Sequence, residues 1–273
     1  MGALFSCLHC LMSQSHLFLA LIGAIGGLIA GTVGLAGGIF LVPAVVALLG
    51  PGAMGEAIVV SFFAVLLNSL SATIENRKAR GPAAYWALIR GAGWYTTGAA
   101  AAALFVAIAV GRHPNAMSRQ SLAALQLLLA ACMLIPRTWY EHLRARHCPL
   151  KDTAVGLLVG GVSTLIGVGG GTYTMFYFLV HGRQIKDCTL TANFVGIFIG
   201  LMGVVGYYGS AAANGASTTS YAIDAASQLL LIGCGAVASP LGVRLQSYVP
   251  SAAIKKLVVL ILVLSSSYAL IGP

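Results

Sequence analysis

The sequence predicts an all-α integral membrane protein built from two inverted-topology repeats of about five helical segments each. Three observations lead to this prediction: a strongly apolar composition, a glycine-rich motif that occurs twice, and an uneven distribution of basic residues. Hydrophobic residues make up 59% of the 273 residues, and charged residues only 8%. Roughly a quarter of the residues in a soluble domain are charged. This chain therefore cannot cover a water-facing surface and has the bilayer as its solvent.

Ten apolar segments follow one another along the chain. We expect an N-terminal tail at 1–16, a first transmembrane repeat at 17–137, a cytoplasmic linker at 138–152 and a second repeat at 153–273. The predicted segments are 17–36, 38–50, 55–74, 84–110, 119–136, 153–167, 170–181, 187–208, 221–240 and 254–271.

Two of these segments, 38–50 and 170–181, are too short to cross a membrane alone. At a rise of 1.5 Å per residue each would form a helix of roughly 17–20 Å. The hydrocarbon core of a bilayer is about 30 Å thick. We therefore expect both to be re-entrant or half-membrane helices.

Each short segment begins with a glycine cluster. Residues 31–40 read GTVGLAGGIF and residues 164–173 read TLIGVGGGTY, and a shift of 133 positions places Gly34, Gly37 and Gly38 on Gly167, Gly170 and Gly171. Glycine in a helix interior costs about 1 kcal/mol relative to alanine, so the clusters predict two breaks in the helices. Irregular backbone inside a bilayer survives only where it is buried in protein or lines a polar cavity.

The two breaks predict an anion site near the middle of the membrane. A helix that starts after a break directs free N–H groups and its positive dipole end into the cavity. Paired glycine-interrupted segments are the best sequence indication of a transporter's binding site. The candidate substrate-binding residues are Thr32, Gly34, Gly37, Gly38, Asn68, Ser69, Gly167, Gly169, Gly170, Gly171, Thr172, Tyr173 and Asn193.

Other readings exist for some of these residues. A buried hydroxyl or amide more commonly bonds a carbonyl of a neighbouring helix than a ligand. The glycines spaced four residues apart are expected to pack helices closely rather than to bind a ligand. These packing glycines are Gly23, Gly27, Gly31, Gly156, Gly160, Gly196 and Gly200.

The basic residues indicate how the chain passes each break. If the chain turns back there, every Lys and Arg except Arg90, Arg112 and Arg119 falls on one side of the membrane. If each short segment instead continues the preceding helix, the charges divide evenly. The positive-inside rule favours the hairpin. It places the linker in the cytoplasm and both termini outside, in the periplasm, for a protein of the inner membrane.

Several function classes are not expected. The spans hold no set of His, Asp and Ser side chains for catalysis. The motif CLHC at Cys7–Cys10 lacks the second ligand pair of a metal site, so neither an enzyme nor a cofactor is predicted. The formal charge of +9 comes from short loops rather than from a basic and aromatic cluster, which argues against nucleic acid.

The expected partners are the lipid bilayer and a small anionic substrate. The acidic residues lie near segment ends or in the linker, so the sequence leaves proton coupling open. Faces of small residues would permit a homodimer, although nothing requires one.

Two sequence motifs resemble a known family. GLAGGIFLVP at 34–43 and GVGGGTYTMF at 167–176 resemble the paired glycine-rich motif of the TauE/SafE sulfite exporter family. Further similar stretches are RGPAAYW at 80–86, SYAID at 220–224 and GAVASPLGVRL at 235–245. AIVVSF at 57–62 departs from that family's A-x-G-T-S-L at Val59 and Val60. The resemblance implies movement of a sulfur-containing anion, such as sulfite, thiosulfate or an organosulfonate, across the inner membrane, often outward.

The expected function is therefore a secondary transporter that exports such an anion by alternating access, with the anion held at the two glycine breaks. Two alternatives stay open. One is a passive anion channel whose pore is lined by the same breaks. The other is a transporter of a carboxylate-type anion without sulfur.

Overall fold

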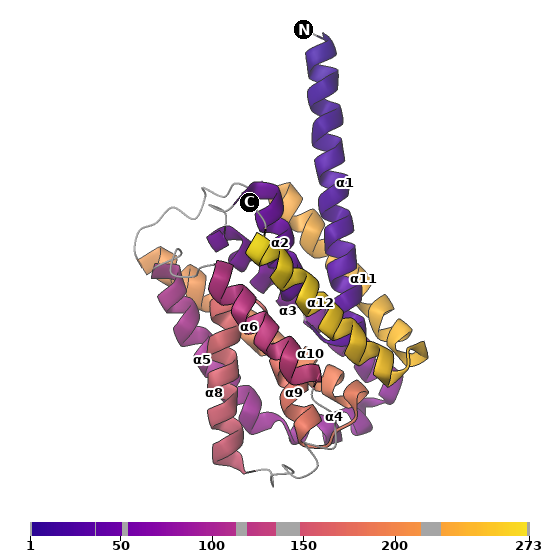
Figure 1. Cartoon of the computed structure of the whole chain (residues 1–273), viewed down its shortest axis with the longest axis vertical. Helices are drawn as coiled ribbons and strands as arrows, with labels where there is room; N and C mark the ends of the chain where they lie inside the picture. Colours follow the sequence, from indigo (N-terminus) through magenta and orange to yellow (C-terminus); the bar gives the residue numbers. More distant parts are fainter. Residues whose placement is uncertain are drawn as a thin grey trace.

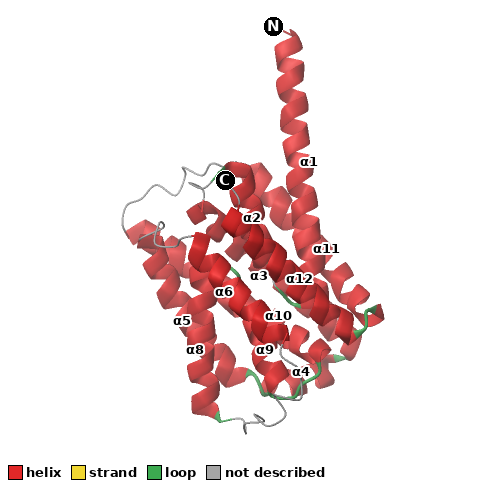
Figure 2. Ribbon diagram, viewed as in Figure 1, coloured by secondary structure: helices red, strands yellow, loops and turns green. Residues whose placement is uncertain are grey.

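The protein is a bundle of α-helices (Figure 1). The computed structural model describes residues 2–35, 37–50, 54–112, 119–134, 148–213 and 225–271, and within these ranges every regular element is helical (Figure 2). The helices are α1 Gly2–Val33, α2 Gly38–Leu49, α3 Met54–Arg80, α4 Pro82–Arg90, α5 Gly93–Arg112, α6 Arg119–Leu134, α8 Pro149–Ile166, α9 Gly171–Val180, α10 Ile185–Ala213, α11 Ala225–Tyr248 and α12 Ser251–Ile271.

Seven stretches of the described helices are long and apolar enough to cross a membrane. The predicted class, an all-helical membrane protein with several spans, is confirmed. The candidate spans are His16–Val33, Gly55–Arg80, Gly93–Arg112, Pro149–Ile166, Ile185–Ser210, Ala225–Tyr248 and Ser251–Tyr268.

The short helices α2 and α9 turn back along the helices that precede them. A Cβ on Gly26 of α1 would lie 3.4 Å from Cγ of Leu41 in α2. One continuous helix would separate these residues by about 22 Å. In the second half, the Tyr177 hydroxyl of α9 donates a hydrogen bond to the Asp152 carboxylate in the first turn of α8. Both contacts require the hairpins that the charge distribution predicted.

Glycines bring two pairs of helices into backbone contact. A Cβ on Gly27 of α1 would overlap the carbonyl oxygen of Gly235 in α11, and a Cβ on Gly160 of α8 would overlap that of Ala99 in α5. Small residues let membrane helices approach this closely. The packing role expected for these glycines is confirmed, and the same contact recurs at Gly23, Gly31, Gly98 and Gly156.

The most extensive contacts between helices link the two halves of the chain. α1 packs mainly against α11, and α8 packs mainly against α5. The helices α3 and α10 pack against each other through the middle, α3 also on α11 and α10 also on α5. The pair α6 and α12 covers one side of the bundle (Figure 1). The short helices follow the same pattern, with α2 packed against α3 and α9 packed against α10.

The segment predicted at 84–110 is not one helix. α4 ends at Arg90 and α5 begins at Gly93, with the chain turning at Gly91 and Ala92. The turn lets the Arg183 side chain approach, since a Cβ on Gly91 would lie 2.6 Å from Arg183 Nη2.

Other boundaries of the prediction differ by a few residues. α3 and α11 extend beyond the predicted segments, to Arg80 and Tyr248. α1 begins at Gly2, so the described part of the predicted tail is helical. α8 begins at Pro149 within the predicted linker, whose residues 138–147 lie outside the described ranges.

Basic side chains gather at one end of the bundle, which we call the basic end; it holds Arg80, Arg183, Lys186, Arg244 and Lys255. Arg80 pairs with Asp187 of α10 at 2.7 Å, and Arg244 pairs with Glu75 of α3 at 2.7 Å. Lys186 donates to the Ser247 carbonyl oxygen at 3.2 Å. Both chain termini lie toward the other end (Figure 1).

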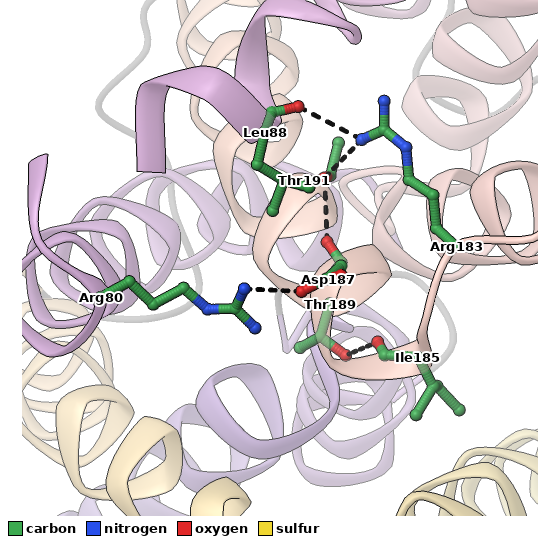
Figure 3. A network of polar contacts seen from close by, with 7 residues as sticks. All are labelled: Arg80, Leu88, Arg183, Ile185, Asp187, Thr189 and Thr191. Carbon is green, nitrogen blue, oxygen red and sulfur yellow. Dashed lines mark hydrogen bonds and ion pairs between the residues drawn. The ribbon is translucent and has the colours of Figure 1, made fainter. Parts of the chain in front are cut away.

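A polar network at the basic end joins α3, α4 and α10 (Figure 3). Arg183 Nη1 donates to the Leu88 carbonyl oxygen at 3.3 Å and to the Thr191 hydroxyl at 3.4 Å. The Thr191 hydroxyl donates to the Asp187 carbonyl oxygen at 2.9 Å. Burial lowers the pKa of the Arg183 guanidinium, yet arginine stays charged in proteins. The network therefore holds a positive charge at the start of α10.

Candidate anion site at the two glycine breaks

The two breaks have the same backbone conformation at equivalent positions. Gly34 and Gly167 have φ values of +72° and +71°, and Gly37 and Gly170 have +78° and +70°. Side chains with a Cβ rarely adopt this left-handed conformation. α2 begins directly after the first pair and α9 directly after the second. Gly169, with φ +72°, belongs to the second break.

The breaks touch each other in the interior. A Cβ on Gly38, the first residue of α2, would lie 2.7 Å from the Gly167 carbonyl oxygen. A Cβ on Gly171, the first residue of α9, would overlap the Gly34 carbonyl oxygen. The first N–H groups of a helix have no acceptor within it, and that end carries positive charge. Two such ends therefore meet at one place, brought there from distant parts of the sequence.

α3 and α10 hold the breaks from either side. Ser61 of α3 donates its hydroxyl hydrogen bond to the Gly167 carbonyl oxygen. The Cα of Ile58 would lie 3.2 Å from a Cβ on Gly167, and the Cα of Thr189 in α10 would lie 2.9 Å from a Cβ on Gly34. Each break is thus supported by the central helix of the other half. Sequence reasoning did not select Ser61 as a site residue.

Four candidate side chains are buried without a hydrogen-bond partner among the described residues. All four are 0% exposed. Leaving a buried polar group unpaired costs about 1–3 kcal/mol, so such a cluster is consistent with groups held ready for a ligand. These residues are Asn68, Ser69, Thr172 and Asn193.

These residues lie on α3, α9 and α10, the helices that form or contact the breaks. The Asn68 Nδ2 atom would lie 3.1 Å from a Cβ on Gly37. Asn193 follows Thr189, which contacts Gly34, by one turn and so shares its face of α10. Thr172 is the second residue of α9. The Asn68 amide therefore lies beside the first break, Thr172 lies in the first turn of the helix that follows the second break, and Ser69 is the residue after Asn68 in α3.

Two other candidates have different surroundings. The Thr32 hydroxyl donates to the Leu28 carbonyl oxygen within α1, so its hydrogen is already used. Tyr173 is half-buried and packs against the apolar core. Among the described residues no three His, Cys, Asp or Glu side chains are grouped as metal ligands would be.

The fold and the site define a class, multi-pass helical membrane proteins in which broken helices meet in the protein interior, as they do in many secondary transporters. The sequence model of the family described as "Sulfite exporter TauE/SafE" matches residues 19–269. The chain therefore belongs to the TauE/SafE sulfite exporter family, as its glycine motifs indicated.

A curated relative is also a membrane protein. The chain is 25% identical over 194 residues to a "Probable membrane transporter protein" of Haemophilus influenzae, an alignment that covers 68% of this chain and 71% of the relative. No solved structure matches the chain.

Proposed function

We propose that the protein is a secondary transporter that carries a small sulfur-containing anion, such as sulfite, thiosulfate or an organosulfonate, outward across the inner membrane. The observation that carries this proposal is the meeting of the two glycine breaks in the interior, with the Asn68 amide next to them. Asn68, Ser69, Thr172 and Asn193, on the helices that form or contact the breaks, are buried without a hydrogen-bond partner among the described residues. The family's description supports the choice of a sulfur oxyanion.

The chemistry of the site suits an oxyanion. Backbone N–H groups at the starts of α2 and α9, together with the amides of Asn68 and Asn193, are donors that sulfur-bound oxygens accept. The named candidates include no Lys or Arg, so the anion would be held by dipoles and neutral donors. Binding without a fixed ion pair favours release on either side of the membrane.

The contacts also support an inverted repeat. The packing of α1 on α11 corresponds to that of α8 on α5, and the packing of α3 on α11 corresponds to that of α10 on α5. Exchanging the two halves therefore returns these main contacts. By the positive-inside rule the basic end faces the cytoplasm and both termini face the periplasm. Alternating access to the central site would then involve equivalent helices from both halves.

The test is transport by purified protein in liposomes, measured as solid-supported-membrane currents and as counterflow. The panel is sulfite, thiosulfate, taurine, sulfoacetate, sulfate, acetate and chloride, each with and without a pH gradient. We expect a saturable response to a sulfur anion with counterflow. A dependence on the pH gradient would establish proton coupling.

Glycine variants connect this transport to the breaks. We expect Gly38→Leu and Gly171→Leu to abolish transport, because each side chain would collide with the opposite break. Gly209→Leu is the matched control, since no atom lies within 4 Å of a Cβ at that position. Current without saturation or counterflow would indicate a channel instead. Activity with acetate alone would indicate a carboxylate transporter.

A further inference from the structure

A cavity opens at the basic end, away from the glycine breaks. Its volume is about 490 Å³, within the range of small-ligand pockets. It is lined by Leu179 at the end of α9, by Arg183 and Gln184 in the connection, by Ile185 at the start of α10, and by Ser251 and Lys255 in the first turns of α12. Segments of three different helices therefore enclose it.

The cavity wall has the chemistry of an anion site. Arg183 and Lys255 bring positive charge to it from two separate elements. Gln184 and Ser251 add neutral donors, and the positive dipole end of α12 lies at Ser251. The combination favours a small anion with several oxygen atoms over a neutral solute.

The nearby carboxylates each have a partner of their own, and Asp187 and Asp152 also interact with the Arg183 guanidinium. Asp187 pairs with Arg80 at 2.7 Å and Glu75 pairs with Arg244 at 2.7 Å. Asp152 accepts the Tyr177 hydroxyl. Arg183 is itself oriented by Leu88 and Thr191 and by the Phe178 ring, whose centroid lies 4.4 Å from Arg183 Cζ. A rigidly placed guanidinium binds an oxyanion at a lower cost in side-chain entropy than a mobile one.

One helix joins this cavity to the central site. α9 starts at Gly171 in the second break and ends at Val180 beside the cavity. Its ten residues span about 15 Å. An anion in the cavity would therefore lie roughly 15 Å from the glycine breaks, which is the length of α9.

We propose that this cavity is a second oxyanion subsite, which takes the transported anion from the water at the basic end before the anion reaches the glycine breaks. The inference rests on the proposed function for its ligand. The phosphate of an anionic lipid headgroup has the same recognition chemistry, so the experiment must distinguish the two sources.

The test uses Lys255→Gln, with Lys256→Gln as the matched control. Lys256 is the next residue of α12, is exposed, and is not among the residues that line the cavity. The probe is thiosulfate, supplied to everted and to right-side-out membrane vesicles. We expect Lys255→Gln to raise KM at the basic end about fivefold. It should leave kcat and the KM at the other face unchanged.

Three further experiments test whether the charge of Lys255 binds the transported anion. Lys255→Arg should restore the wild-type KM, because it retains the charge. The effect of Lys255→Gln should shrink in high salt, which screens exposed charges. Liposomes of pure phosphatidylcholine and liposomes containing phosphatidylglycerol are compared, and an effect confined to the second would assign the cavity to a lipid and overturn the substrate subsite.

Failure of this inference differs from failure of the proposed function. If the wild type carries thiosulfate and the two lysine variants have the same KM, the subsite is wrong and the transporter stands. If the wild type carries no anion of the panel, the transporter is wrong, and calorimetric binding of thiosulfate to purified protein decides the subsite. Weaker binding to Lys255→Gln than to Lys256→Gln supports the subsite, and equal or absent binding overturns it.

Discussion

Asn68 and Asn193 each bury a side-chain amide whose oxygen and nitrogen have no partner among the described residues. A folded protein gains nothing from such groups, because each unpaired atom loses its hydrogen bonds to water. Because Asn68 lies next to a break in the backbone and Asn193 one turn from Thr189, which contacts the other side of that break, we propose that these two amides bind the ligand.

We expect Asn193→Leu to separate stability from transport. Leucine has a similar volume and removes the unpaired amide, so Tm in detergent should stay constant or rise. Transport should fall at least about tenfold, corresponding to the loss of one hydrogen bond to a charged ligand. The measurements are a thermal melt and thiosulfate counterflow on the same preparation.

Gln126→Leu is the control for this prediction. Gln126 is 1% exposed and its amide likewise has no partner among the described residues, but it lies in α6, which packs mainly against α12. Its variant should melt no lower than the wild type and transport normally. A loss of stability in Asn193→Leu with unchanged transport would mean that the amide is structural.

Individual site residues were predictable to different degrees. The glycines could be selected because they repeat at a fixed shift, and Asn68 and Asn193 because an amide is conspicuous within an apolar helix. Ser61 gave no such signal, since its contact with Gly167 spans 106 positions of the sequence. The family's G-T-S triplet corresponds to Val59–Ser61 in the first half and to Leu190–Ala192 in the second, so the position equivalent to Ser61 is Ala192, which has no hydroxyl group.

At the scale of helices, backbone contact through glycine governs the packing of α1 on α11. Gly27→Ala should destabilise the protein by about 1–3 kcal/mol, because the added methyl group would overlap the Gly235 carbonyl oxygen. A Cβ on Gly233, in the partner helix α11, meets no atom within 4 Å, so Gly233→Ala is the matched control. It should instead be neutral or stabilise by up to about 1 kcal/mol.

Thermal melts of the two alanine variants in detergent check this expectation. Gly27→Ala should lower Tm by several degrees, while Gly233→Ala should not lower it. Equal melting temperatures would show that α1 can withdraw from α11 at little cost. The close backbone approach would then not be what holds this helix pair together.

The positions of the helices were largely predictable and their breaks only partly so. Segment length and the distribution of Lys and Arg were enough to predict the hairpins before α2 and α9. The turn at Gly91 and Ala92 was missed because the residues on both sides are apolar, and hydropathy does not distinguish one helix from two. The Arg183 side chain, which packs against that turn, comes from a distant part of the sequence.

For the whole molecule, the arrangement of the helices constrains how access could alternate. Because α1 is joined to α11 and α8 to α5 by backbone contacts, the two halves of the sequence cannot separate as units without breaking both pairs. The contacts instead favour two bodies that each draw on both halves. One comprises α1, α3 and α11, and the other α5, α8 and α10. They meet where α3 crosses α10.

The two ion pairs at the basic end can show which units move during transport, these two bodies or the two halves of the sequence. Both pairs link the first half of the chain to the second. Arg80–Asp187 joins α3 to α10 and so lies between the two bodies. Glu75–Arg244 joins α3 to α11 and lies within one of them. Opening of the basic end should therefore separate the first pair and leave the second intact.

Cross-linking tests this last prediction. In a background without native cysteines, Arg80→Cys/Asp187→Cys and Glu75→Cys/Arg244→Cys are each bridged with a short, cleavable bis-maleimide, and thiosulfate counterflow is measured before and after cleavage. We expect the first bridge to reduce transport at least about tenfold, reversibly, because it ties the two bodies together, and the second to be tolerated. If both bridges stop transport, the halves of the sequence move as units. If neither does, α3 and α10 stay together at the basic end throughout the cycle.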